Sequence, residues 1–192
     1  MKIGLFFGSF NPIHHGHLII ANIMATTTDL DEVWFVVSPK NPFKSSNSLL
    51  HEHDRYEMVE VAIKGNPNFM VSDIEFHMPR PSFTIDTMTY LADKHPHHQF
   101  FLIIGSDNLL SFHKWKNSQS ILDNFGLLVY RRPGYSEKKF KVQDRSNIRF
   151  VEAPLLEISA TFIRKQIAQG HSIQYLTPDS VIHMIKDRMF YL

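Results

Sequence analysis

The sequence contains no cysteine, and this absence excludes several kinds of site. Disulfide bonds, thiolate nucleophiles and cysteine-ligated zinc all need that side chain. A chain without disulfides suits a reducing compartment. We therefore expect a cytoplasmic protein.

Charge of one sign is not in excess either. Lys and Arg together number 20 and Asp and Glu 19, which gives a formal net charge of +1. Proteins that bind long nucleic acids or anionic membranes usually carry a broad basic surface, and this composition does not predict one. We expect neither nucleic acid nor a membrane as a partner, and any anion-binding site must be local.

Long hydrophobic runs and linker-like stretches are also missing. The longest strongly apolar run, residues 100–104, is far shorter than the roughly 20 residues that span a bilayer. Gly8, Asn11 and Pro12 interrupt the first apolar run before a signal-peptide core is complete, so we expect no export signal. No Gly/Ser-rich or Pro-rich segment divides the chain, which predicts one domain, residues 1–192.

Histidine, in contrast, is abundant, with 12 residues. Clusters at residues 51–54 and 95–98 raise the alternative of a metal site. The first cluster opens a predicted helix, where acidic residues favour the helix dipole, and the second surrounds Pro96 in a predicted turn. We expect most of these side chains to be solvated and assign no metal ligand.

Six short apolar runs predict buried strands, because they are apolar on both faces rather than alternating. The runs are residues 2–8, 33–37, 69–72, 99–105, 126–130 and 148–151. Helical patterns cover residues 16–27, 51–65, 83–95, 111–124 and 161–170, and a last helix is expected from Pro178. This alternation predicts an α/β fold with a doubly wound, Rossmann-like parallel sheet and helices on both faces. Ligands of such sheets bind beyond the carboxyl ends of the strands, so the loops after residues 8, 37, 105 and 130 are expected to carry the chemistry.

The loop at residues 8–17, Gly-Ser-Phe-Asn-Pro-Ile-His-His-Gly-His, follows the first predicted strand. Gly8 lets the backbone approach a ligand closely, and the N–H groups at the following helix start favour a phosphate. His14 and His17 are three residues apart, so both rings could face one phosphate, and Gly16 leaves room between them. Zinc held by the three histidines of this loop is the alternative. Carboxylates usually lie beside zinc ligands, and the loop has none, so phosphate binding is favoured.

The pattern Gly-x-Phe-x-Pro-x-His-x-Gly-His at residues 8–17 resembles the first signature of the nucleotidyltransferase superfamily that includes the nicotinate and nicotinamide mononucleotide adenylyltransferases. The second signature of that superfamily is matched by Ile-Ser-Ala-Thr-Phe-Ile-Arg at residues 158–164. Two separate motifs in the expected order make the resemblance specific. Asn11 stands where many members have Asp, and Ala160 stands where many have Ser.

For the first signature, the resemblance implies a phosphate-binding role. The backbone at Ser9 and Phe10 would contact phosphate, and His14 and His17 would bind the phosphates of ATP.

For the second signature, it implies that Arg164 and the helix start at Ser159 and Thr161 hold the β and γ phosphates. We expect Arg164 in the first turn of this helix, where a cation opposes the helix dipole unless an anion lies between them. Ser159 is expected to cap the helix. The alternative for Arg164 is a surface ion pair with Glu157 or Asp179.

Further segments resemble the acceptor and ribose contacts of nicotinate mononucleotide adenylyltransferases. The residues concerned are Thr84 and Ile85 around the pyridine ring, Gly105 and Asp107 against the ribose, and Trp115 and Lys116, where the tryptophan stacks on the pyridine. Taken singly, each has a simpler explanation: Ser82 could cap a helix, Asp107 could be a helix cap, and Trp115 could lie in the core. Taken together, at successive strand ends, they favour a pocket. Lys44 and Arg132 are further candidate anion contacts, for which surface solvation is an equally good account.

The resemblance implies adenylyl transfer from ATP to nicotinate mononucleotide, which gives deamido-NAD and pyrophosphate in NAD biosynthesis. The expected reaction is in-line attack of the acceptor phosphate on the α-phosphorus, with His14 and His17 stabilising charge and Mg²⁺ as the cofactor. Nicotinamide mononucleotide and phosphopantetheine also come into question as acceptors, although pantetheine-phosphate enzymes usually have Thr at the position of His14. A cytidylyltransferase or a non-catalytic nucleotide-binding module would also fit the first signature, although the intact histidine pair with Arg164 argues against the module. The oligomeric state stays open.

Overall fold

The structure is a computed structural model that describes residues 1–39, 49–131, 146–154 and 156–192. Two of the candidate anion contacts, Lys44 and Arg132, lie outside the described residues. Within those ranges, no helix is long and apolar enough to cross a lipid bilayer.

The described residues form a six-stranded parallel sheet with the strand order β3-β2-β1-β4-β5-β6. Its strands are β1 (Lys2–Gly8), β2 (Glu32–Val37), β3 (Phe69–Ser72), β4 (Gln99–Gly105), β5 (Leu127–Tyr130) and β6 (Ile148–Val151). This order confirms the predicted doubly wound, Rossmann-like fold. From β1 the chain adds strands first on one side, β2 and β3, and then on the other, β4, β5 and β6, so the strand order reverses between β1 and β4. Ligands of such sheets bind at this point, beyond the carboxyl ends of the strands.

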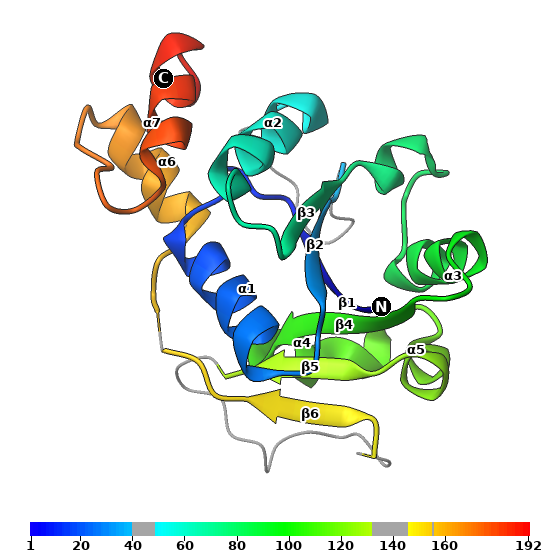
Figure 1. Ribbon diagram of the computed structural model, residues 1–192. Coiled ribbons are helices and arrows are strands. Elements are labelled where there is room, and N and C mark those ends of the chain that lie inside the picture. Colours follow the sequence, from blue (N-terminus) through cyan, green and yellow to red (C-terminus); the bar gives the residue numbers. More distant parts are fainter. Residues whose placement is uncertain (40–48, 132–145, 155) are drawn as a thin grey trace.

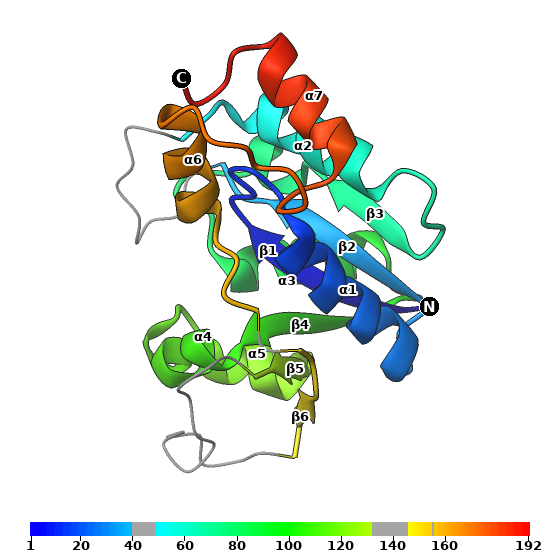
Figure 2. The ribbon, with the colours of Figure 1, turned by 90° about the vertical axis from the view of Figure 1, so that its left-hand side faces the viewer.

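Helices cover both faces of the sheet, as Figure 1 shows. One face carries α1 (His15–Thr27), α2 (Glu52–Ile63), α6 (Ala160–Ala168) and α7 (Asp179–Asp187), and Figure 2 looks onto this face. The other face carries α3 (Thr84–Lys94), α4 (Ser106–Ser111) and α5 (Ser118–Asn124). Short 3-10 helices, η1 (Ile74–His77) and η2 (Phe112–Lys114), follow β3 and α4.

Alternate residues of the central strands feed two separate hydrophobic cores. Phe6 and Phe35 pack with α1 and α2, whereas Leu5 and Trp34 pack with α3 on the opposite face. Because both faces are buried, each strand appears in the sequence as a continuous apolar run, which is why the strands could be predicted.

One predicted helix is wrong. The pattern at residues 111–124 predicted a single helix, whereas the chain forms α4 directly after β4, then η2, and then α5 from Ser118. Asn117 has a φ of 48°, and Trp115 is extended with ψ of 148°, so the helix is interrupted at both residues. The other predicted helices and strands begin and end within two residues of the observed ones, and η1 was not predicted.

Candidate active site

The loop between β1 and α1 turns tightly over its own aromatic ring. Phe10 is buried and has a φ of 43°, in the left-handed region. A Cβ at Gly8 would lie 2.8 Å from carbons of the Phe10 ring. The predicted reason for Gly8 is the close approach of a ligand, and the packing of the loop on its own Phe10 ring also requires a glycine there.

His14 and His17 stack on each other at the start of α1. His14 is the N-cap residue and His17 the third residue of the helix, and their ring centroids are 3.7 Å apart with an interplanar angle of 22°. The backbone N–H of His14 donates to Nδ1 of His17 at 3.3 Å, as in a capping box. A ring nitrogen that accepts a hydrogen bond carries no proton, so the neutral ring of His17 carries its proton on Nε2.

Gly16 leaves the space that the ring of His14 occupies. A Cβ at Gly16 would lie 3.0 Å from Nδ1 and 3.1 Å from Cε1 of His14, and 3.8 Å from Cβ of Ile158. A Cβ there would make a tight contact, so the ring of His14 would have to shift by a few tenths of an ångström. Gly16 therefore eases the packing of this ring, and the two rings stack directly on each other. The roles of the two rings stay predictions.

The second motif docks onto the first through Arg164. Its guanidinium donates from Nη1 to the carbonyl oxygen of Asn11 at 2.8 Å and from Nη2 to Oγ1 of Thr161 at 3.3 Å. The described residues show no ion pair of Arg164 with Glu157 or Asp179. The two signatures, far apart in the sequence, are therefore in direct contact.

The start of α6 agrees with the sequence analysis in its cap but not in the position of Arg164. Oγ of Ser159 accepts the N–H of Phe162 at 3.2 Å, which confirms the predicted cap. Because α6 already begins at Ala160, Arg164 is its fifth residue and not part of the first turn, as had been expected. Its side chain reaches back past the helix start to the loop.

Asn11, the departure from the common Asp, is buried at the centre of this junction. Its Oδ1 accepts the hydroxyl of Tyr191 at 2.8 Å and the N–H of Leu50 at 3.3 Å. Burial raises the pKa of Tyr191, which keeps its hydroxyl protonated as a donor. An amide oxygen takes both donors without burying a charge, which accounts for Asn at this position.

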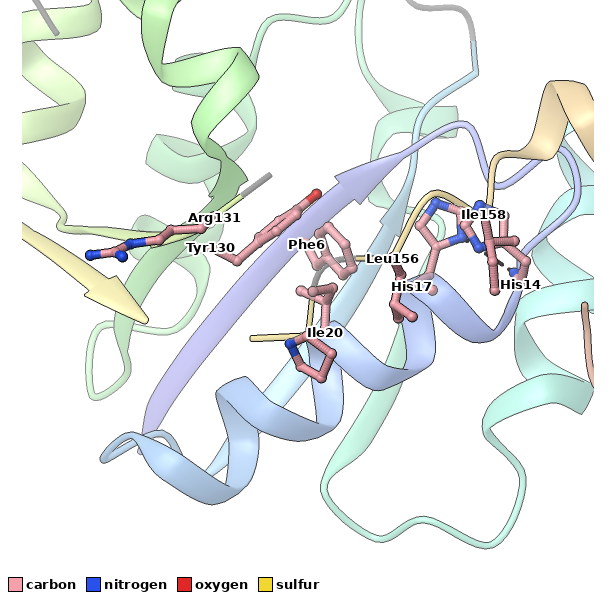
Figure 3. A pocket seen from close by; sticks show the side chains of 10 residues that line it. Phe6, His14, His17, Ile20, Tyr130, Arg131, Leu156 and Ile158 are labelled. Carbon is pink, nitrogen blue, oxygen red and sulfur yellow. Dashed lines mark hydrogen bonds between the residues drawn. The ribbon is translucent and has the colours of Figure 1, made fainter. Parts of the chain in front are cut away.

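A small pocket lies beside the histidine pair. Figure 3 shows His14 and His17 at one end and Tyr130 and Arg131 at the other, with the Arg131 side chain directed away from the histidines. Arg131 forms an ion pair with Glu152 at 3.2 Å. Arg131, which directly follows β5 and lines the pocket, was not among the predicted site residues, and the predicted Arg132 is the next residue along the chain, outside the described ranges.

Strand β4 continues into α4 without a loop. Gly105 is the N-cap residue of α4, and Asp107 lies in the first turn, where a carboxylate favours the helix dipole. The alternative that Asp107 caps the helix is therefore wrong. A Cβ at Gly105 would clash with the carboxylate of Asp107 and lie 3.2 Å from the phenol of Tyr130. Gly105 thus lets both side chains lie close to its backbone, beside the point where the strand order reverses.

The predicted acceptor segments meet on the α3 side of the sheet. Nζ of Lys116 lies 2.8 Å from Oδ2 of Asp86 and 4.7 Å from the ring centroid of Phe83. Trp115 is half-buried and packs on Phe112, with ring centroids 5.5 Å apart. Lys116 is therefore engaged with the start of α3, and part of the indole of Trp115 stays exposed.

The first turn of α3 is capped by no side chain. Phe83 is its N-cap residue, so the alternative that Ser82 caps the helix is wrong. The backbone N–H groups of Thr84 and Ile85 precede the first helical hydrogen bonds, and the helix itself offers them no acceptor. Because α3 runs opposite to the strands, these donors lie at the carboxyl edge of the sheet.

The parallel sheet has the strand order of a nucleotide-binding α/β protein. Two stacked imidazoles lie at the start of α1, beside the point where that strand order reverses, and a helix start favours phosphate. Together these features define a nucleotide-binding α/β protein. The family model described as cytidylyltransferase-like matches residues 5–166 of the chain, from β1 to α6.

Two curated relatives extend over the whole chain. The "Probable nicotinate-nucleotide adenylyltransferase" of Cytophaga hutchinsonii is 59% identical over 191 residues, which cover 100% of this chain and 98% of the relative. The protein of the same name from Flavobacterium johnsoniae is 46% identical over 191 residues, with coverage of 100% and 99%. The chain therefore belongs to the cytidylyltransferase-like family, in the group of the nicotinate-nucleotide adenylyltransferases.

A solved structure has the same fold. The Plasmodium falciparum nicotinic acid mononucleotide adenylyltransferase complexed with NaAD matches with a TM-score of 0.82 and covers 99% of this chain and 97% of that chain. The sequence identity is 21%, so this likeness concerns the fold alone.

Proposed function

We propose that the chain transfers the adenylyl group of ATP to nicotinate mononucleotide, which gives deamido-NAD and pyrophosphate, a step of NAD biosynthesis. Relatives that are 46% and 59% identical over the whole chain carry this activity in their names. The single observation that carries the proposal is the stacked pair of His14 and His17 at the start of α1, joined to Arg164 through the carbonyl of Asn11.

In the proposed reaction, an oxygen of the acceptor 5′-phosphate attacks the α-phosphorus of ATP. The bond from that phosphorus to the bridging oxygen of the β-phosphate breaks, and pyrophosphate leaves with the bonding electron pair. No covalent enzyme intermediate is required, so the protein has to position two anions and stabilise charge. Nε2 of His17 supplies a donor at the helix start, and the backbone at Ser9 and Phe10 lies on the same loop.

Arg164 and the capped start of α6 are proposed to hold the β and γ phosphates. The guanidinium already lies against the loop of the first signature, 2.8 Å from the carbonyl of Asn11. Two of its five donors are used in the described contacts, with Asn11 and Thr161, which leaves further N–H groups for phosphate oxygens.

We propose Mg²⁺ as the cofactor, carried to the site by ATP. Mg²⁺ prefers oxygen ligands and is commonly bound through substrate phosphates, and the β1–α1 loop offers mainly imidazoles and backbone N–H groups. The ion would neutralise charge on the phosphate oxygens. We also propose that the reaction takes place in the cytoplasm, which suits a chain without cysteine.

The test is pyrophosphate release from ATP and nicotinate mononucleotide, with the dinucleotide product identified by its mass. We expect equal amounts of pyrophosphate and deamido-NAD, full loss of turnover with EDTA, and recovery with added Mg²⁺. Nicotinamide mononucleotide and phosphopantetheine serve as competing acceptors, and CTP replaces ATP in a parallel series. No dinucleotide from any pyridine mononucleotide would refute the proposed function, and recovery with zinc alone would support the zinc alternative for the histidines.

A further inference from the structure

Arg55, the fourth residue of α2, is a wholly buried cation behind the β1–α1 loop, with 0% of its surface exposed. Among the described residues, its guanidinium donates only to backbone carbonyl oxygens. Nη1 donates to Ser9 at 2.7 Å and to Ser38 at 2.8 Å, Nη2 donates to Pro39 at 2.8 Å, and Nε donates to Leu50 at 2.9 Å. Four carbonyls from three stretches of chain thus meet on one side chain.

Burying a charge is costly unless it is paired and hydrogen-bonded. Within the described ranges, no carboxylate forms a salt bridge with Arg55, and the nearby Glu52 pairs with Arg80 at 2.6 Å instead. Burial lowers the pKa of Arg55 to about 10, so the side chain stays charged at neutral pH. An apolar residue would fill the same volume without this cost, so the planar array of donors is what the position requires.

The carbonyls that Arg55 binds lie at the ends of two neighbouring strands. Ser9 directly follows β1 and lies in the loop that leads to the histidine pair, whereas Ser38 and Pro39 directly follow β2. The backbone N–H of Ser38 also donates to the carbonyl of Gly8 at 2.9 Å. Arg55 therefore fixes the phosphate-binding loop to the segment after β2.

We propose that Arg55 is a positioning residue for nucleotidyl transfer, which acts by holding the backbone at Ser9, and with it the loop of His14 and His17, in one fixed place. The proposal rests on the proposed function, since it assigns Arg55 to the same site. It requires no contact between Arg55 and a substrate. A displacement of about 1 Å in a reacting geometry can lower a rate on the order of 100-fold, so loosening this loop has a kinetic effect of its own.

The experiment compares Arg55→Lys with Val59→Ala, a matched control at another wholly buried position of the same helix. Lysine keeps the charge but cannot make the guanidinium's planar set of contacts. The values of kcat and of KM for ATP are measured per folded molecule, well below the melting temperatures of both variants. We expect kcat/KM for ATP to fall by about 10-fold to 100-fold in Arg55→Lys and to stay near the wild-type value in Val59→Ala. Both variants should have a lower melting temperature than the wild type.

Equal kinetics per folded molecule in Arg55→Lys and the control would overturn the proposal and leave Arg55 a purely structural residue. A second measurement, on the wild-type protein, keeps the test open if Arg55→Lys does not fold. Nitrogen-15 NMR of arginine side chains should show the N–H signals of Arg55 slow to exchange, both in the free protein and with saturating α,β-methylene-ATP and Mg²⁺. Fast exchange of these signals in either state would show that Arg55 does not hold the loop and would also overturn the proposal. Wild-type protein without turnover would refute the proposed function itself, which is a different outcome from an active wild type with an equally active Arg55→Lys.

Discussion

At the scale of single residues, different contacts fix the rings of His14 and His17, the two histidines of the first signature. His17 has its Nδ1 held by the backbone N–H of His14, which directs its remaining proton to Nε2. His14 is buried, and its ring lies over the open space at Gly16. The spacing His-x-Gly-His thus follows from stacking and packing within one helix turn.

We predict that His17→Ala and His14→Ala each lower kcat by about 100-fold or more, since removing one preorganised charge-stabilising donor commonly has such an effect. His15→Ala is the matched control, because His15 lies between them, and its described hydrogen bond to Leu176 uses the backbone N–H. Steady-state pyrophosphate release measures all three variants, and circular dichroism checks their folding. A near-normal kcat in both His14→Ala and His17→Ala would remove the histidines from the mechanism.

At the scale of the elements, α6 brings the second signature to the first. Its cap at Ser159 fixes the helix start, and the fifth residue, Arg164, reaches the carbonyl of Asn11. The same guanidinium therefore has two duties, a tether to the loop and the proposed contact with phosphates. A substitution can separate these duties, because only the second depends on ATP.

We predict that Arg164→Ala raises KM for ATP and lowers kcat/KM, because the β and γ phosphates lose a charged, fork-shaped partner. Lys165→Ala is the matched control, since Lys165 is the next residue of α6 and is exposed. The two variants are compared over a range of ATP concentrations at saturating acceptor. Unchanged ATP kinetics together with a lower melting temperature would leave Arg164 the role of a tether alone.

The elements that could be predicted from sequence are those with a local signal. Strands buried on both faces appear as apolar runs, and Ser159 and Gly170 bound a helix as expected from cap preferences. The helix predicted at residues 111–124 failed because nothing in its apolar pattern reveals the left-handed Asn117. Helix periodicity alone does not report a single residue that leaves the helical region.

At the scale of the whole molecule, the site is assembled from contacts between residues distant in the chain, and these could not be predicted. The motifs located His14, His17 and Arg164, but no local pattern links Tyr191 to Asn11 or the guanidinium of Arg55 to the carbonyl of Ser9. Such contacts depend on how strands and helices pack. The parallel sheet brings them together, since every loop after a strand lies at the same edge.

The same geometry bears on the choice of acceptor, because α3 and the segment after η2 meet at that edge. The N–H groups of Thr84 and Ile85 are left without a helical acceptor, and Lys116 holds the neighbouring Asp86 in an ion pair. Nicotinate carries a carboxylate, which accepts from such donors with both oxygens. Nicotinamide carries an NH₂ group on one side, so it would leave one buried N–H without an acceptor.

We therefore predict a kcat/KM for nicotinate mononucleotide at least about 100-fold higher than for nicotinamide mononucleotide, since unpaired buried donors can discriminate by several orders of magnitude. Trp115→Ala should lower kcat/KM for both acceptors to a similar degree, because an indole stacks equally well on either ring. Trp34→Phe is the control, since Trp34 is a buried residue of β2 whose side chain packs in the hydrophobic core. Steady-state kinetics with both acceptors at saturating ATP make the comparison.

Comparable wild-type kcat/KM values for the two acceptors would contradict the preference for the acid and leave adenylyl transfer itself standing. An effect of Trp115→Ala on one acceptor alone would instead show that the indole takes part in the discrimination.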